Sequence, residues 1–235
     1  MSKKGYIKDV KFNVLKSGNH WETDEFEKGK HNGEDLISRT PDTKATACYI
    51  TAIDDGTVTV VSKTKTRGNY VEIKHQLGIS RYLHMKDNTI KVKVGEKVKR
   101  GQLLGYMGKT GEGVTGTHLH LAIVINGEYV DPYPFIKGLY ILNLKIGDYK
   151  LIKNKYIRTS PEVKATNKVK YSKVDSDLKY KFECDTLGFA KYKIGADVHI
   201  REFKKDKKGN WWGLTKNTYF CVFDKKGYQV TYNGC

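Results

Sequence analysis

The chain has 235 residues, of which 38% are hydrophobic and 11% aromatic, and this composition excludes disorder as its main state. No window approaches the roughly 20 consecutive apolar residues of a membrane-spanning helix. The formal charge of +17 attracts polyanions such as nucleic acid, anionic lipid or phosphate-rich wall polymers, but it does not choose among them. We therefore expect a soluble globular protein with one large domain or two small ones.

The N-terminal segment is basic but has no apolar stretch of about 7 to 15 residues behind it, so we expect no secretory signal and a cytoplasmic protein. No Cys-x-x-Cys pair is present, which argues against a cysteine zinc site. In a cytoplasm we expect reduced thiols, mostly buried in strands, although a disulfide between Cys184 and Cys221 stays open. The four cysteines are Cys48, Cys184, Cys221 and Cys235.

Strand patterns dominate the first half of the chain. Alternating or β-branched runs predict strands at residues 46–53, 57–62, 70–75, 80–85 and 118–125. The Asn126-Gly127 pair predicts a hairpin between residues 119–125 and 128–130. Because no long stretch of helical periodicity competes, we expect a mostly β fold built on antiparallel sheet.

The segment Asp131-Pro132-Tyr133-Pro134 ends this series, since proline does not fit inside a central strand. We predict a first domain over residues 1–138, a linker over 139–147 and a second domain over 148–235. Residues 1–138 carry +6 of the formal charge and residues 139–235 carry +11. Strands of the second domain are expected at 149–158, 179–184, 198–203, 211–215, 219–223 and 228–232.

Two histidines head the apolar strand at residues 118–125. Residues i and i+2 of a strand point to the same face, so His118 and His120 share one face while Leu119 points into packing on the other. Each imidazole must satisfy a donor and an acceptor. A shared metal, or one ligand beside one acid–base group, would satisfy both rings.

An upstream motif supplies the other groups of such a site. His31 and Asp35 are four residues apart, with Gly33 between them to let the backbone curl. Two imidazoles and one carboxylate suit Zn²⁺, and three protein ligands with a fourth position left to water are the arrangement of a catalytic zinc. Either motif alone is a weak signal, so the prediction depends on their joint occurrence in a β context.

The segments between these histidines carry a family resemblance. They read Ala52-Ile53-Asp54-Asp55-Gly56, Arg81-Tyr82-Leu83-His84, Val94-Gly95-Glu96, Gly101-Gln102-Leu103-Leu104-Gly105, Gly108-Lys109-Thr110-Gly111 and Thr115-Gly116-Thr117-His118-Leu119-His120. Over residues 28–137 the chain resembles the LytM/lysostaphin-type zinc metallopeptidases of family M23, which cleave peptide stems or bridges of bacterial peptidoglycan.

The resemblance implies a role for each histidine of the motifs. His31, Asp35 and His120 match the three zinc ligands, so it implies one Zn²⁺ per chain. His84 and His118 match two non-ligand histidines that flank the metal-bound water and act in catalysis. Which of these two is the base stays open.

The remaining histidines and the second domain receive simpler interpretations. We expect His75 to be structural, and His20 and His199 to lie at the surface. Residues 148–235 resemble bacterial SH3-like (SH3b) wall-targeting modules, at 155–161, 195–200, 209–213 and 219–223. The resemblance implies a small β-barrel that binds the cell wall. Because no zinc ligands are apparent in this part of the sequence, we predict that it has no catalytic role. Strand alternation predicts that one of Trp211 and Trp212 lies in its core.

The function predicted from the sequence is that of an endolysin-like peptidoglycan hydrolase, a zinc endopeptidase that cleaves wall peptides with zinc-activated water. We expect a monomer that binds peptidoglycan and anionic wall polymers, with no nucleic-acid or membrane partner. It would be made in the cytoplasm of a phage-infected bacterium and act on the wall after release.

Two other function classes compete with this prediction. One is a non-catalytic wall-binding or regulatory protein with a degenerate peptidase fold. The intact set of His31, Asp35, His84, His118 and His120 argues against it. The other is a basic nucleic-acid-binding barrel, which would bind nucleic acid with a steep salt dependence.

Overall fold

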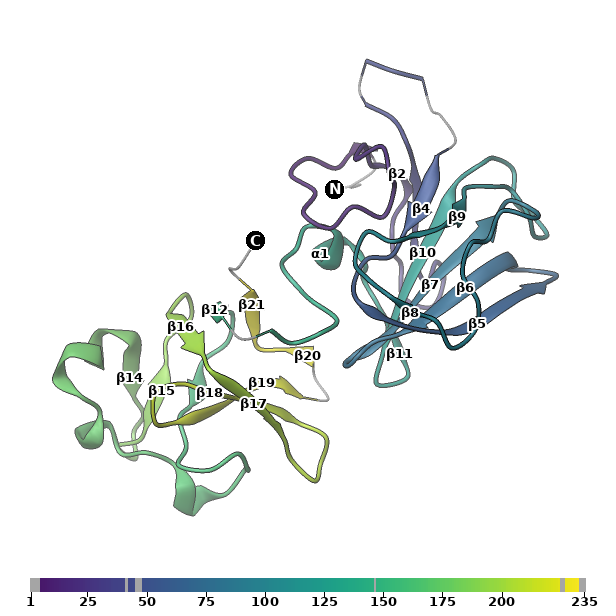
Figure 1. The fold of residues 1–235 in the computed structure, drawn as a ribbon. Helices are drawn as coiled ribbons and strands as arrows, with labels where there is room; N and C mark the ends of the chain where they lie inside the picture. Colours follow the sequence, from purple (N-terminus) through teal and green to yellow (C-terminus); the bar gives the residue numbers. More distant parts are fainter. Residues whose placement is uncertain (1–4, 41, 45–47, 146, 225–226, 233–235) are drawn as a thin grey trace. The chain divides into compact units, whose positions relative to one another are not determined.

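A computed structural model of the chain describes residues 5–40, 42–44, 48–145, 147–224 and 227–232. The chain folds into two compact units, Met1–Asn143 and Leu144–Cys235 (Figure 1). The division falls inside the segment 139–147 that we expected to be a linker. Within the described residues no helix is long and apolar enough to cross a membrane.

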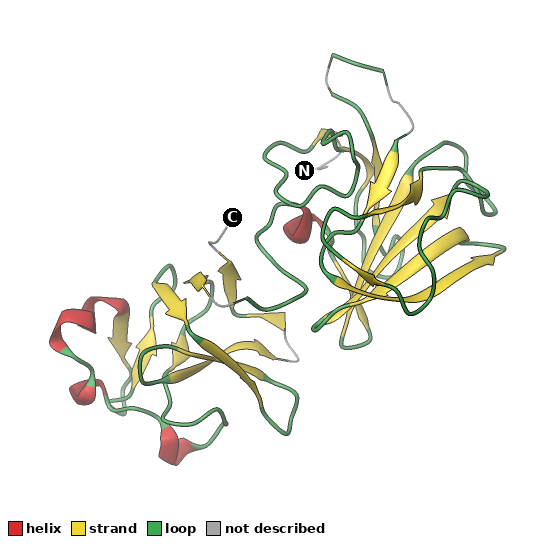
Figure 2. Ribbon diagram, in the orientation of Figure 1, coloured by secondary structure: helices red, strands yellow, loops and turns green. Residues whose placement is uncertain are grey.

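The first unit is built on a nine-stranded antiparallel sheet (Figure 2). Its strands are β1 (Gly5–Tyr6), β2 (Trp21–Asp24), β3 (Glu34–Ile37), β5 (Gly56–Thr64), β6 (Gly68–Lys74), β7 (Gly78–Met85), β8 (Lys97–Val98), β10 (Leu119–Ile125) and β11 (Glu128–Val130). They follow the order β1-β2-β3-β10-β7-β6-β5-β8, with β11 paired to β10. A second ladder pairs β4 (Tyr49–Thr51) with β9 (Leu103–Tyr106), and a short helix, α1 (Tyr133–Ile136), follows β11.

Strand β10 lies between β3 and β7, and its register positions the predicted site. His120 is the partner of Asp35 on β3 and of Leu83 on β7. Leu119 and Leu121 on either side of His120 are fully buried, while His120 itself is half-buried. The prediction that Leu119 packs on the face opposite His120 is confirmed.

Most of the predicted strands of this unit are present. Strands β5, β6, β7 and β10 coincide with four of the five predicted segments, whereas β4 is shorter than the predicted 46–53. Residues 46 and 47 lie outside the described part of the chain. The predicted hairpin joins β10 to β11, with φ of 53° at Asn126 and 83° at Gly127, as a type I′ turn requires.

The C-terminal segment of the first unit is hydrogen-bonded to the buried carboxylate of Asp54. The backbone N–H groups of Leu142 and Asn143 both donate to Asp54 Oδ2, each at 3.1 Å. The other oxygen of Asp54 accepts a 2.8 Å hydrogen bond from Arg100. Ile141 and Leu142 are buried. Residues 139–143 of the expected linker therefore belong to the packed first unit.

The described residues of the second unit form three small antiparallel sheets and three 3₁₀ turns. The sheets have the orders β16-β12-β21, β13-β15-β14 and β17-β18-β19-β20. Their strands are β12 (Gly147–Leu151), β13 (Lys155–Tyr156), β14 (Phe182–Cys184), β15 (Ala190–Tyr192), β16 (Asp197–Ile200), β17 (Glu202–Lys205), β18 (Trp211–Leu214), β19 (Tyr219–Asp224), β20 (Gly227–Tyr228) and β21 (Val230–Tyr232). The turns are η1 (Ala165–Asn167), η2 (Tyr171–Lys173) and η3 (Ser176–Lys181). The antiparallel, mostly β fold class predicted for the chain is confirmed in both units.

Several predicted strands of the second unit are divided. The segment 198–203 breaks at Arg201, because β16 pairs with β12 in one sheet and β17 pairs with β18 in another. The segment 149–158 likewise becomes β12 and β13, which belong to different sheets. Residues 179–181 are in the 3₁₀ turn η3 and not in a strand. Trp212 is buried at 1% exposure and Trp211 is half-buried, so the prediction for this pair is confirmed.

Two expectations about side-chain burial are wrong. His20 has no exposed surface, because its Nε2 accepts hydrogen bonds from the backbone N–H groups of Val14 and Leu15.

Cys184 is exposed although it lies in a strand, whereas Cys221 is buried. Cys48, Cys184 and Cys221 are all free thiols, so the Cys184–Cys221 disulfide is not formed. Cys235 lies outside the described residues.

Candidate metal centre

Five predicted side chains meet at one end of the central strands of the first unit. Asp35 comes from β3, His84 from β7 and His120 from β10. His118 immediately precedes β10, where it forms an isolated bridge with Gly108. His31 lies in the turn before β3, and its backbone N–H bonds to the carbonyl of Glu27.

Three of these side chains place a lone-pair donor within reach of a single ion. His31 Nε2 lies 3.3 Å from Asp35 Oδ1 and 3.2 Å from His120 Nδ1. Asp35 Oδ1 lies 2.8 Å from His120 Nδ1. Tetrahedral zinc with bonds of about 2.0–2.1 Å separates its ligand atoms by about 3.3 Å. Within the described ranges this is the only group of three or more such residues that could hold a metal ion, and its donor set fits zinc.

The ring of His31 is oriented by a hydrogen bond outside this group. Its Nδ1 donates to the carbonyl oxygen of Glu25 at 2.8 Å, which directs Nε2 at Asp35 and His120. A backbone carbonyl in this role fixes the tautomer of a metal-binding histidine. The outer hydrogen bond therefore supports the same donor atom that the distances select.

Gly33 keeps space open for the ring of His120. A Cβ at this position would lie 2.4 Å from His120 Nε2 and 2.7 Å from the carbonyl oxygen of Leu121. Neither contact is sterically possible without displacement. The sequence suggested Gly33 as a point where the backbone curls, and the structure adds that a side chain there would collide with a predicted ligand.

His84 and His118 stand beside the three donors in a matched arrangement. His84 Nδ1 donates to the Thr110 carbonyl at 2.9 Å, and His118 Nδ1 donates to the Gly116 carbonyl at 2.9 Å. Their ring centroids are 4.9 Å apart. Because Nδ1 is occupied in each ring, Nε2 is the atom left for chemistry, and His118 Nε2 lies 3.5 Å from Asp35 Oδ2.

His84 has an unusual backbone conformation. Its φ is 64°, in the left-handed region that a residue with a side chain seldom adopts. Its backbone N–H donates to the Arg67 carbonyl at 3.0 Å. A strained residue held by hydrogen bonds on both its backbone and its ring is typical of functional sites.

The close packing of these groups shifts their pKa values. Burial acts to raise the pKa of Asp35, but hydrogen bonds from His120 and His31 outweigh it and hold that pKa well below its ordinary range. The hydrogen bond with Asp35 raises the pKa of His31 to about 9. Burial, together with the charge of His118, lowers the pKa of His84 to about 4. His84 is therefore neutral at pH 7.

The other three histidines lie away from this group. His20 is in the core, as described above. His199 is exposed and bonds to Asp148 at 2.8 Å, which agrees with its predicted surface position. His75 bonds to the Asp55 carbonyl through Nδ1 and to the Ser80 hydroxyl through Nε2, as a structural histidine would.

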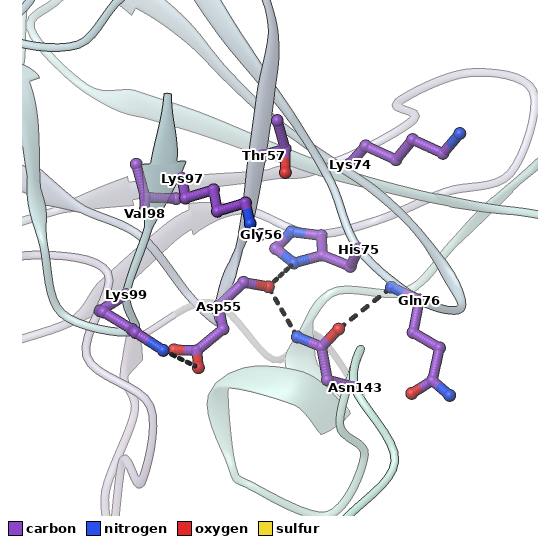
Figure 3. A pocket seen from close by; sticks show the side chains of 10 residues that line it. All are labelled: Asp55, Gly56, Thr57, Lys74, His75, Gln76, Lys97, Val98, Lys99 and Asn143. Carbon is purple, nitrogen blue, oxygen red and sulfur yellow. Dashed lines mark hydrogen bonds and ion pairs between the residues drawn. The ribbon is translucent and has the colours of Figure 1, made fainter. Parts of the chain in front are cut away.

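His75 also lines a pocket of about 470 Å³, which Figure 3 shows. Several of its polar groups already bond to one another, since Asn143 joins the Asp55 carbonyl to the backbone N–H of Gln76. Lys99 in turn bonds to the Asp55 carboxylate at 3.2 Å. None of the five site residues lines this pocket, so its size does not make it the centre of the chemistry.

Sequence reasoning missed the backbone carbonyls that orient the imidazoles. The carbonyls of Glu25, Thr110 and Gly116 each accept from one ring. A backbone carbonyl acceptor cannot be predicted from a pattern of side chains. The only signal was the run of glycines around Thr110 and Gly116, which permits tight turns beside the site.

The chain is similar to known peptidases. Residues 29–132 match the model of peptidase family M23. The chain is 44% identical over 105 residues to peptidoglycan DD-endopeptidase ShyC of Vibrio cholerae, an alignment of 43% of this chain and 22% of that protein. It is 33% identical over 117 residues to glycyl-glycine endopeptidase ALE-1 of Staphylococcus capitis, over 47% of this chain and 30% of that protein.

A solved zinc-containing peptidase from Vibrio cholerae is also similar, at 29% identity and a TM-score of 0.45, over 54% of this chain and 40% of that one. The chain thus spans less than a third of the length of the two curated relatives. The family match falls on the first unit, where the histidines meet. Residues 29–132 constitute a peptidase domain of family M23.

Proposed function

We propose that this protein is a zinc endopeptidase that hydrolyses peptide bonds in the stems or cross-bridges of bacterial peptidoglycan. The observation that carries the proposal is the group of His31, Asp35 and His120, with donor atoms 2.8 to 3.3 Å apart and two further imidazoles beside it. The relatives named peptidoglycan DD-endopeptidase and glycyl-glycine endopeptidase support the substrate class.

In this proposal His31, Asp35 and His120 hold one zinc ion. When bound, zinc supplies Lewis acidity, which polarises a carbonyl oxygen and lowers the pKa of water toward about 7. Asp35 contributes the negative charge of the ligand set, and its low pKa keeps the carboxylate ionised throughout the working range. The Glu25 carbonyl keeps the ring of His31 in the tautomer whose Nε2 can bind.

His84 and His118 would move protons. Each ring has Nδ1 bonded to a carbonyl, so Nε2 is the position at which a proton is taken up or released. Burial opposes the charged form of His84, so its ring is neutral at pH 7 and Nε2 carries a free lone pair. General acid–base groups of this kind contribute about 10² to 10⁴ in rate.

For the second unit we propose wall binding by an SH3b-like module without catalysis. Its +11 charge and its half-exposed aromatic residues, such as Trp211, support attraction to anionic wall polymers and contact with peptide or sugar. The endolysin-like role, synthesis in a phage-infected cytoplasm with action after release, and the monomeric state remain predictions.

The test is digestion of purified walls, measured as release of new amino groups. We expect release by the wild-type chain, abolition by a chelator, and recovery when zinc is returned. His118→Ala should slow release by about 100-fold or more. His199→Gln, which replaces an exposed histidine of the second unit, is the matched control and should match the wild type.

The competing interpretation, a non-catalytic wall-binding protein, predicts adsorption to walls without release of amino groups. A His118→Ala variant that releases them as fast as the wild type would contradict the catalytic assignment.

A further inference from the structure

A second feature of the first unit lies next to the histidine group. It is a pocket of about 370 Å³, here called the Lys86 pocket. It is lined by Lys86, Asp87, Tyr106, Met107, Gly108, Lys109, Thr110 and Thr117. Thr117 directly precedes His118 in the chain, so the pocket borders the candidate centre.

The wall of the Lys86 pocket is joined to both non-ligand histidines by hydrogen bonds. The Gly108 carbonyl accepts from the backbone N–H of His118 at 3.1 Å. The Thr110 carbonyl accepts from His84 Nδ1, and the Thr110 hydroxyl donates to the Met85 carbonyl at 2.8 Å. A group bound in this pocket would therefore be fixed in position relative to the two imidazoles.

The charge of the Lys86 pocket is positive. Its one acid, Asp87, bonds to Lys63 at 3.0 Å and to Asn69 at 2.9 Å, so its charge is already compensated. Lys86 lies 5.7 Å from the ring centroid of Tyr106, and across the part of the chain that the structure describes neither Lys86 nor Lys109 forms an ion pair with a carboxylate. These two ammonium groups are available to an anion.

Two lysines near the pocket, unlike Lys86 and Lys109, form ion pairs with carboxylates. Lys63 pairs with Asp87, and Lys65 pairs with Glu112 at 3.2 Å. Of these four lysines, the two that line the pocket, Lys86 and Lys109, are thus the ones without an ion pair in the described residues. A matched control follows from this contrast, since Lys65 carries the same charge on a nearby loop but already has an acidic partner.

We propose that the Lys86 pocket binds a free carboxylate on the residue that flanks the scissile bond, so that the preferred substrates are carboxylate-bearing peptides and not glycyl bridges. The inference rests on the proposed endopeptidase function. A glycine has no side-chain carboxylate to offer, whereas a diamino-acid residue with a second carboxyl group has one. Exposed pairs of this kind contribute a modest but measurable preference, which salt weakens.

The experiment uses two cross-linked wall peptides that are identical except for a carboxylate or a carboxamide on the residue flanking the scissile bond. Binding of each to the zinc-loaded chain is measured by calorimetry, and cleavage is measured separately. The wild type should bind the carboxylate form about three- to ten-fold more tightly at low salt. The preference should shrink in 0.5 M salt, as expected for partly screened charges.

The double variant K86Q/K109Q should lose this preference, to within two-fold, while K65Q keeps it. Equal binding of the two peptides by the wild type, no binding of either, or an unchanged preference in K86Q/K109Q would overturn the inference. Binding with preference but without cleavage of either peptide would uphold the pocket and instead contradict the proposed endopeptidase function.

Discussion

The two units of this protein differ in how their charged and polar side chains are arranged. In the first unit, imidazoles and a carboxylate converge on the central strands β3, β7 and β10 of a nine-stranded sheet. In the second unit, whose largest sheet has four strands, lysines lie over aromatic rings, such as Lys168 at 3.8 Å from the Tyr156 centroid. The described part of this unit contains no group of potential metal ligands.

This difference suggests that the two units have separate roles, one in chemistry and one in attraction to a charged polymer. Chemistry needs side chains held within fractions of an ångström, which strands paired on both sides can provide. Attraction to a charged polymer needs only exposed charge and flat aromatic faces. The unit with the larger excess charge, +11 against +6, is the one without the metal-binding group.

The largest expected effect tests whether the chemistry belongs to the first unit alone. Asp35→Ala removes the carboxylate that contacts both His31 and His120. We expect wall hydrolysis to fall by about 100-fold or more, since loss of an outer partner of a ligand already costs about 10- to 100-fold. The readout is amino-group release from walls, and activity within two-fold of the wild type would contradict the assignment.

The next effect tests whether the two units can be separated. Trp212 is 1% exposed and its Nε1 donates to Asp206 at 3.0 Å, so Trp212→Ala should destabilise the second unit by about 4 kcal/mol. We expect adsorption to walls to fall while cleavage of a small soluble peptide is retained. Trp211→Ala, at a half-buried position, should leave the second unit folded. If Trp212→Ala lost peptide cleavage as much as adsorption, the claim that the two units can be separated would be contradicted.

A third effect concerns pH and the core of the first unit. Burial lowers the pKa of His20 from 6.5 to about 4, because the charged ring is disfavoured there. Above pH 6.5 both the folded and the unfolded chain hold a neutral His20. As the pH falls from about 6.5 to about 4 this histidine gains a proton only in the unfolded chain, so His20 alone lowers the stability by about 3 kcal/mol.

Calorimetric unfolding between pH 7 and 4 measures this loss. His20→Gln should reduce the loss by about 3 kcal/mol, the part that His20 contributes, whereas His199→Gln, at an exposed position, should not alter it. A first unit equally stable at pH 7 and pH 4 would show that His20 does not behave as a buried neutral group.

The smallest effect is a steric one inside the candidate centre. Gly33→Ala would place a methyl group 2.4 Å from His120 Nε2, so we expect a stability loss of about 2 kcal/mol and weaker metal binding. Gly116→Ala is the control, because a Cβ there meets nothing within 4 Å. Thermal unfolding distinguishes them, and identical melting of the two variants would contradict the close approach at Gly33.

Local features of the fold were predictable because they depend on neighbours in the chain. The Asn126-Gly127 turn follows from the positive φ that these residues tolerate, and the shared face of His118 and His120 follows from the two-residue period of a strand. The short strands β1, β2 and β3 were not predicted. Sequences such as Trp21–Asp24 carry too little apolar alternation to mark them.

The pairing of the site residues could not be derived from local pattern. His120 faces Asp35 across the β3–β10 register, which joins residues 85 apart in sequence, and beforehand only the joint occurrence of the two motifs and the family resemblance linked them. His20 was placed at the surface because its partners are backbone N–H groups of Val14 and Leu15, which no side-chain pattern reveals. The sequence therefore lacked two kinds of information, the non-local strand register and the backbone groups that donate to or accept from the histidine rings.

The central claim is that His31, Asp35 and His120 together bind one zinc ion, and metal analysis of the purified chain tests it most directly. After equilibration with zinc and removal of the excess, the wild type should retain one zinc per chain, and so should His118→Ala and His199→Gln. Asp35→Ala should retain almost none. A wild type without bound zinc, or an Asp35→Ala variant that holds it as firmly, would contradict the account.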